Sequence, residues 1–335
     1  MSLGKKSIRD AKFCGNDAVP LIATCLLAAF AIACAGTPSP AQEVPPAPPL
    51  AFIAEWGASG GGAGQLSKPE WMATDFAGNV FIADYGSGFI HKFNFEGHPL
   101  LSFDAGVPRN PYRVAVDSGN GIYAIGEDSN VLYICSPQGE HFRHFALAPQ
   151  RPHQVAEAAS VDDAGDIFVI VGGESKGKDD SAKREIREYN ARGRLLKKLA
   201  MPEGSSAAPF VPAALAAASD GYLYVVDASS TQVAKFTLSG DYVTAWGSPP
   251  SPGTPGSADS PGRGIAVTSK YVFVAEPENR GVRAWTVDGH EKIVDDLGGR
   301  LKGANGAYQV ATSRRGELLV LDFTAAKVLR FKINF

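Results

Sequence analysis

The chain has 335 residues, of which 44% are hydrophobic and 20% are charged, so it can build a large core in about one to three domains. The formal net charge is −3, and 28 basic and 33 acidic side chains remain when residues 1–33 are left out. This balance argues against a general nucleic-acid-binding protein, because such proteins usually carry a basic excess. A local basic patch stays compatible with it.

Residues 1–33 have the layout of a secretory signal, with basic residues first, then an apolar run, then small residues. The run of about 15 residues is shorter than the ~20 that a membrane-spanning helix needs. The residues before Cys34 resemble the bacterial lipobox, although Ala31 stands where Leu is usual. The resemblance implies that Cys34 carries a lipid. An ordinary signal cut near Ala35 or Ala41, or an uncleaved helix, is the alternative.

Residues 34–49 are predicted to form a Pro-rich linker, which favours extended polyproline conformation and cannot build a core. It would act as a spacer between the membrane and the folded part. Cys135 is the only cysteine beyond the signal and Cys34, so no disulfide can form within the folded part. Its apolar, strand-like surroundings predict a buried, inert thiol.

The remaining residues, 50–335, contain an internal repeat, which is the first feature to seek in a chain of this kind. Each unit has an aliphatic residue, a mostly aromatic residue three positions later and, in five units, a closing Gly. The aliphatic residues are Ile90, Leu132, Ile186, Val233, Val282 and Val328. The aromatic column is Phe93, Cys135, Tyr189, Phe236, Trp285 and Phe331. Because such segments favour strands and Gly permits a positive φ, each unit predicts a hairpin.

Another two strands precede each hairpin strand, and a fourth follows each Gly, so every unit predicts a four-stranded propeller blade. The sequence holds six inner sets of strands but only five complete outer ones. Residues 51–57 match residues 243–247 in type and in their Trp-Gly ending, and they supply the missing strand. We therefore expect an all-β fold, a six-bladed β-propeller over residues 50–335 whose N-terminal strand closes the last blade and removes the exposed sheet edges.

The first unit carries a pattern that resembles the NHL-repeat family of six-bladed propellers. The pattern comprises Trp56-Gly57, the glycines of 60–64, Lys68-Pro69, Asp75, Gly78-Asn79, Ala83-Asp84 and residues 89–97. The resemblance extends over about residues 50–335 and weakens in blades three and five. Blade three has a charged insertion at 174–183, which is expected to be a solvated loop.

The resemblance also implies a ligand-binding face where the inner strands begin, near the mouth of the central channel. Its mixture of aromatic, cationic and amide groups suits a polar or anionic ligand, and Arg113, His153 and Arg263 are expected to converge. A mouth that is merely polar and wet is the alternative. The candidate ligand-binding residues are Glu70, Trp71, Tyr112, Arg113, His153, Gln154, Arg263, Tyr308 and Gln309.

Four carboxylates end the strand that precedes the hairpin strand of their blades, and this recurrence predicts that they accept hydrogen bonds from backbone N–H groups in the next turn. They are Asp84, Asp227, Glu276 and Asp322.

The six histidines do not indicate a metal site. Only His153 falls at the channel mouth, and His141 and His144 are expected on opposite sides of a strand because they are three residues apart. Propeller lyases that cleave peptidyl-hydroxyglycine use several converging His, and lactonase-type propellers use a Glu, Asn and Asp set; only Glu70 weakly matches either. We therefore expect no metal, no cofactor and no catalytic residue.

These observations favour an exported, membrane-tethered binding or scaffold module that takes a protein, peptide or glycan partner at the channel mouth. The expected place is the bacterial cell envelope, on its periplasmic or extracellular face, with the protein a monomer that binds no nucleic acid. A metal-dependent propeller enzyme of the lyase or lactonase type is the alternative.

Overall fold

The computed structural model describes residues 48–108, 110–147, 154–173, 184–201, 210–228, 230, 232–247, 264–276, 281–295, 297–301, 307–313 and 315–335. The expected signal segment and lipidation site, most of the linker, the charged insertion, His153 and Arg263 lie outside the described residues. Within them, no helix has the length and apolar character needed to cross a bilayer.

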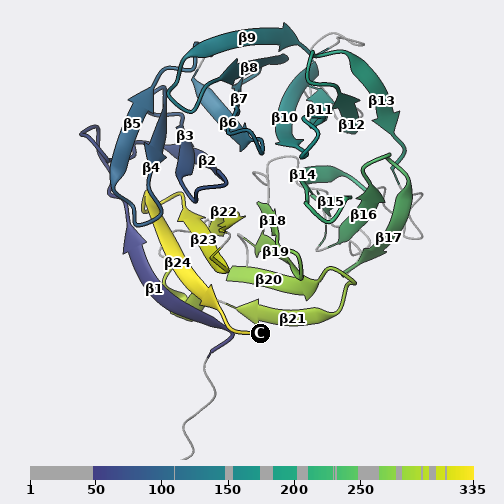
Figure 1. Ribbon diagram of the computed structural model, residues 1–335. Helices are drawn as coiled ribbons and strands as arrows, with labels where there is room; N and C mark the ends of the chain where they lie inside the picture. Colours follow the sequence, from purple (N-terminus) through teal and green to yellow (C-terminus); the bar gives the residue numbers. More distant parts are fainter. Residues whose placement is uncertain are drawn as a thin grey trace, which may run out of the picture. The chain divides into compact units, whose positions relative to one another are not determined.

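The described residues form six four-stranded antiparallel sheets arranged as a ring (Figure 1), which confirms the six-bladed propeller. Blade one comprises β2 (Pro69–Thr74), β3 (Val80–Asp84), β4 (Phe89–Phe93) and β5 (Pro99–Phe103). Blade two comprises β6 (Pro111–Val116), β7 (Ile122–Gly126), β8 (Val131–Cys135) and β9 (His141–Ala146). Blade three comprises β10 (Gln154–Val161), β11 (Ile167–Gly173), β12 (Glu185–Tyr189) and β13 (Leu195–Leu199). Blade four comprises β14 (Pro212–Ala217), β15 (Tyr222–Asp227), β16 (Val233–Thr237) and β17 (Tyr242–Trp246). Blade five comprises β18 (Ile265–Val267), β19 (Tyr271–Glu276), β20 (Gly281–Thr286) and β21 (Glu291–Asp295), and the short 3-10 turn η1 (Leu297–Gly299) follows it. Blade six comprises β22 (Ala307–Thr312), β23 (Glu317–Asp322), β24 (Lys327–Ile333) and β1 (Leu50–Trp56).

Burial within each blade explains its sequence pattern. The second strand is covered on both faces by neighbouring blades, so it reads as a continuous apolar run; every residue of β3 is buried. The outer strand β17 is largely exposed. Apolar clusters form between successive blades, as where Met72 and Phe93 of blade one meet Leu319 and Val328 of blade six.

The ring closes through the first strand of the domain. β1 pairs antiparallel with β24, with Phe52 opposite Phe331 and Trp56 opposite Val328, which confirms the expected closure. The backbone N–H of Asn334 also donates to the carbonyl oxygen of Pro49 at 2.9 Å. This pairing covers the edge of β24 that would otherwise be open.

Each outer strand carries a one-residue bulge opposite the aromatic column. The bulged residues are Ile53, Leu100, Phe142, Leu196, Val243 and Lys292. A bulge strengthens the local twist, and the outer strands run along the rim of the disc (Figure 1). In blade two the bulge brings the rings of His141 and His144 to one side, with centroids 5.5 Å apart and both near Tyr133. The expectation that these histidines face opposite sides was therefore wrong.

The glycine that closes each hairpin has a packing role as well as a backbone role. Gly97 has a φ of +90°, and a Cβ there would lie 2.2 Å from Cγ of Trp56, the last residue of β1. Gly139 has the same relation to Phe103, at 2.4 Å. The aromatic end of one blade thus rests on the hairpin turn of the next, which only Gly accommodates.

Candidate functional site

A cavity of about 160 Å³ follows the axis of the ring and is lined by all six inner strands. It extends from Trp71 and Gln309 at one end to Thr74 and Thr312 at the other. Between these ends its wall consists largely of small and aliphatic side chains, such as Val114. We call the end at Trp71 and Gln309 the channel mouth.

Hydrogen bonds join neighbouring blades at the end opposite the mouth. Thr74 donates from Oγ1 to the carbonyl oxygen of Thr312 at 3.0 Å, and Thr312 donates likewise to Val267 at 3.3 Å. The N–H of Ala217 donates to Oγ of Ser160 at 2.9 Å. These bonds tie blades six, one and five together and blade three to blade four, so the polar groups at this end are already paired.

At the mouth, five inner strands bulge near their first residues, and a bulge changes the direction in which a side chain projects. The bulged residues are Glu70, Tyr112, Glu157, Ala213 and Tyr308.

Blade three departs from the expected alignment at this point. Ala158 pairs with Ile170 as Trp71 pairs with Ala83, so Glu157 takes the position of Glu70. The alignment of His153 and Gln154 with this position was therefore wrong by four residues. Gln154 begins a longer β10 and accepts a hydrogen bond from the buried Arg187 at 2.5 Å.

The Arg113 side chain is buried and makes its contacts within the fold around the mouth. It is only 5% exposed, and its guanidinium carbon lies 4.3 Å from the ring centre of Trp71 and 3.7 Å from that of Tyr112. Its Nε donates to the carbonyl oxygen of Glu157 at 2.7 Å, and Nη1 donates to that of Tyr112 at 3.2 Å. The side chain therefore connects the inner strands of blades one, two and three through stacking and charge-assisted hydrogen bonds.

Glu70 and Lys68 form an ion pair beside this cluster. Nζ of Lys68 lies 3.1 Å from Oε1 of Glu70, with the Glu70 side chain 4% exposed and the Lys68 side chain 49% exposed. The same Nζ lies 4.5 Å from the ring centre of Tyr85 and 5.9 Å from that of Phe323. Burial raises the pKa of the Glu70 carboxyl above its ordinary value, although Lys68 and Arg113 oppose the shift.

Gln309 places an amide against the cavity wall without a partner. The residue is 4% exposed, and its Oε1 has no hydrogen-bond partner among the described residues. A Cβ on Gly264 would lie 1.6 Å from this oxygen, so the missing side chain of Gly264 makes the room that the amide occupies. A buried amide oxygen without a partner is costly, and such a group calls for an explanation.

The structure thus brings Glu70, Trp71, Tyr112 and Arg113 to the mouth, with Gln309 on the cavity wall. The backbone of Tyr308 lies in β22, and its side chain is outside the description. Sequence reasoning missed Lys68, Tyr85 and Glu157. Lys68 stood in the recognised Lys-Pro pair, and Glu157 would have been found by aligning blade three backwards from β11.

Asp84, Asp227 and Asp322 accept backbone hydrogen bonds; the predicted bond from the next turn is present at Asp84, from Gly86 at 3.3 Å, and at Asp322. Asp84 accepts from the N–H groups of Ser67 and Lys68 at 2.8 and 2.6 Å, in the loop before β2 rather than only in the following turn. Asp227 accepts from Val211 and Asp322 from Ala325, both at 2.9 Å. Glu276 pairs with Arg283, with the Nε of Arg283 2.8 Å from the Oε1 of Glu276.

Within the described residues, no three His, Cys, Asp or Glu side chains gather as a metal site would require. Cys135 is fully buried, as predicted, and burial raises the pKa of its thiol to about 11.

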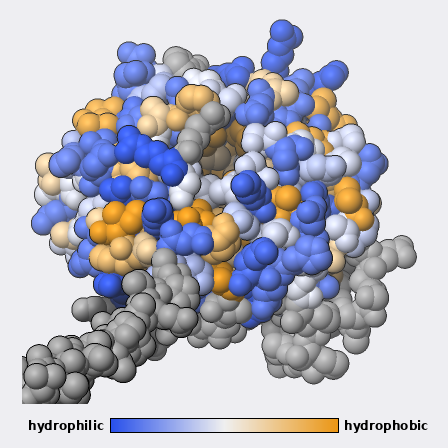
Figure 2. Space-filling view, turned by 60° about the horizontal axis from the view of Figure 1, so that its bottom comes forward, coloured by the Kyte–Doolittle hydropathy of each residue, from blue (hydrophilic) through white to orange (hydrophobic). Residues whose placement is uncertain are grey.

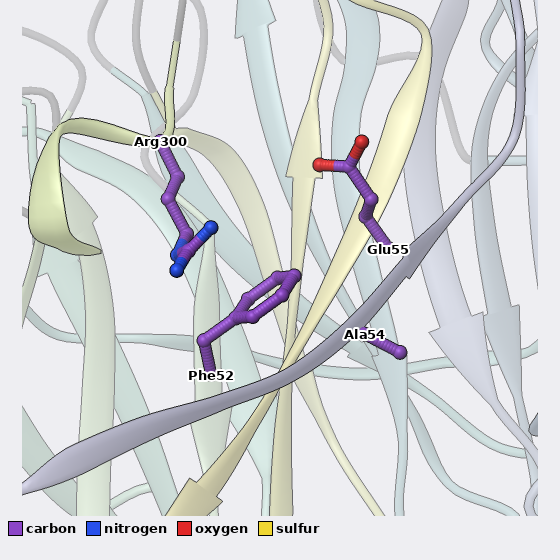
Figure 3. Close-up of a pocket in the computed structure, with 4 residues that line it drawn as sticks. All are labelled: Phe52, Ala54, Glu55 and Arg300. Carbon is purple, nitrogen blue, oxygen red and sulfur yellow. The ribbon is translucent and has the colours of Figure 1, made fainter. Parts of the chain in front are cut away.

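A second hollow lies on the rim, where β1 closes the last blade. It has a volume of about 580 Å³ and is lined by Phe52, Ala54, Glu55 and Arg300 (Figure 3). The guanidinium of Arg300 lies 3.7 Å from the ring centre of Phe52, and Glu55 pairs with Lys327. Figure 2 shows the apolar residues of the visible face as separate patches among hydrophilic ones. The rim hollow is open and shallow, and its charged groups have neighbours of their own.

Comparison with known proteins supports the fold and goes no further. No family model matches the chain, and no curated protein sequence matches it. A solved streptogramin B lyase superposes with a TM-score of 0.54 at 14% identity, covering 80% of this chain and 94% of that one. Virginiamycin B lyase from Staphylococcus aureus gives 0.54 at 14%, covering 84% and 99%. A chain of a nidogen/laminin complex gives 0.52 at 13%, covering 73% and 85%. At these identities the likeness establishes a six-bladed propeller only, because one fold serves both lyases and binding proteins.

Proposed function

We propose that this protein is an exported propeller, held to a bacterial membrane by a lipid on Cys34, that binds a protein, peptide or glycan partner at the channel mouth. The NHL-like repeat pattern and the lipobox-like sequence motivate the proposal. Gln309 is the observation that supports ligand binding at the mouth. Its buried amide oxygen on the cavity wall has no partner among the described residues, and a ligand that donates a hydrogen bond would satisfy it.

The free-energy cost of leaving this oxygen without a hydrogen bond gives a test of the proposal. Leaving a buried acceptor unsatisfied costs about 1–3 kcal/mol, so Gln309→Leu should raise the unfolding free energy of the unliganded protein while weakening ligand binding. A residue retained only for packing would behave oppositely, since its replacement would lower stability. Gln138→Leu, on an exposed turn away from the mouth, is the matched control.

The binding experiment uses the full chain in detergent, screened against arrays of peptides and of glycans. We expect at least one ligand whose binding is lost in Gln309→Leu and in Trp71→Leu but kept in Phe76→Ser, which alters an exposed aromatic in the β2–β3 turn at the other end of the channel. Ligands that bind all three variants equally well would contradict a site at the mouth.

The tether is tested separately in the bacterial host with an alkyne-tagged fatty acid. Wild-type protein should incorporate the label and enter the detergent phase of a Triton X-114 separation, whereas Cys34→Ser should do neither. Label that persists in Cys34→Ser would show that the anchor is elsewhere or absent from this position.

A further inference from the structure

The described cations at the channel mouth are already engaged, which limits the ligands that this part of the mouth can take. Arg113 donates to two carbonyl oxygens and stacks between two rings. Arg184 pairs with Glu157 at 2.6 Å, and its side chain is 14% exposed. Of the described cations here, only Lys68 has a side chain that is about half exposed. An anionic ligand would have to compete with these partners.

The acceptors at the mouth are in surplus. Oε1 of Gln309 has no partner among the described residues, and the buried carboxylate of Glu70 forms its ion pair with the half-exposed Lys68. Three aromatic rings, those of Trp71, Tyr85 and Tyr112, border the same region. Carboxylate and amide oxygens beside aromatic faces are the environment that a cationic group prefers.

Lys68 already shows how an ammonium group sits there. Its Nζ contacts the Glu70 carboxylate and lies over the Tyr85 ring, with Phe323 of blade six on another side. Because its side chain is 49% exposed, it can turn into solvent when another cation takes its place beside Glu70. Lys68 therefore occupies the position that a ligand's own ammonium would take.

We infer that the ligand of the channel mouth presents a primary ammonium group, which displaces Lys68 from Glu70 while a neighbouring donor satisfies Gln309. This inference rests on the proposed function, since it names the chemistry of the same site, and it puts a cationic group in place of the expected polar or anionic ligand. The ammonium can belong to a lysine-containing peptide or to an amino sugar, and both supply the same contact.

The experiment measures binding of matched probes to the full chain in detergent by calorimetry. One set comprises pentalysine, its Nε-acetylated form and pentaglutamate. The other comprises a glucosamine pentamer, its N-acetylated form and an oligogalacturonate. We expect the amine member of one set to bind at least tenfold more tightly than its acetylated form, and the set that responds identifies the source of the amine.

Four variants locate the contact. Glu70→Gln should weaken amine binding at least tenfold, whereas Glu140→Gln, the same change on an exposed turn, should not. Lys68→Met should tighten it about threefold or more by removing the internal competitor, whereas Lys332→Met on the exposed side of β24 should leave it unchanged. Circular dichroism melts show whether each variant is folded.

Each remaining outcome overturns the inference. If the acetylated or acidic probes bind as well as the amines and still depend on Glu70, the mouth binds ligands but of another class, and the proposed function stands. If amines bind equally to wild type and Glu70→Gln, they bind elsewhere. If no amine binds, the inference fails, and the array screen alone decides the proposed function.

Discussion

The contact between Trp56 and Gly97 predicts how much Gly97→Ala destabilises the fold. The magnitude follows from a comparison of Gly97 with Gly221. Both Gly97 and Gly221 have positive φ, at +90° and +86°, but only Gly97 has a neighbour in the way of a Cβ. The left-handed conformation costs a non-glycine residue about 1–2 kcal/mol, so Gly221→Ala should lose about that much. Gly97→Ala must also displace the Trp56 ring, which adds about 1–3 kcal/mol of overpacking.

Urea unfolding followed by circular dichroism measures both variants. We expect the two to differ by about 1–3 kcal/mol, and the double variant Trp56→Ala/Gly97→Ala to show less loss than the two single changes added together. Equal destabilisation by Gly97→Ala and Gly221→Ala would refute the argument that the hairpin glycine is needed for contact between blades.

Three further predictions concern closure, the buried thiol and a strand-end carboxylate. Deleting Met1–Trp56 should lower the urea midpoint and promote aggregation by opening the edge of β24, whereas deleting only Met1–Ala47 should not; equal midpoints would contradict closure. Because burial raises the pKa of Cys135 to about 11, its thiol should react with a disulfide reagent at pH 8 only after urea unfolds the chain, and rapid native reaction would contradict this burial. Burial alone would raise the pKa of Asp84, but hydrogen bonds from His91, Ser67 and Lys68 hold it below its ordinary 3.8. Its stabilisation is therefore present above about pH 4 and is lost as pH falls through its folded pKa, so the stability deficit of Asp84→Asn should shrink on acidification from pH 6 to pH 3. Asp288→Asn, at an exposed turn, serves as the comparison, and a pH-independent deficit for Asp84→Asn would argue against the lowered pKa.

The architecture was predictable because the same sequence pattern recurs in each blade. The spacing from Ile90 to Phe93 and the closing Gly97 recur along the chain, and a repeated pattern of this kind fixes the number of blades. The matching Trp-Gly endings of residues 51–57 and 243–247 revealed the closing strand. These are local signals: the spacing from Ile90 to Phe93 has five other copies, and the closing Gly has four.

The site was less predictable because it depends on exceptions to the repeat. Blade three has a longer first hairpin, so counting from the start of β10 pointed to His153 when the equivalent residue is Glu157. A bulge at residue 142 changed the sides on which His141 and His144 project. The engagement of Arg113 by carbonyl oxygens from two blades is a tertiary property, which no spacing within one blade can show.

The bulges in the outer strands affect how copies of this protein can contact one another. Each rim strand has a side with no neighbour inside the molecule, and a flat row of free N–H and C=O groups there would invite intermolecular sheet growth. One extra residue in every rim strand interrupts that row and turns it. Leu100, 53% exposed, and Ile53, 43% exposed, are the bulged residues of two of these edges. The bulges therefore disfavour edge-to-edge sheet pairing between copies of this chain.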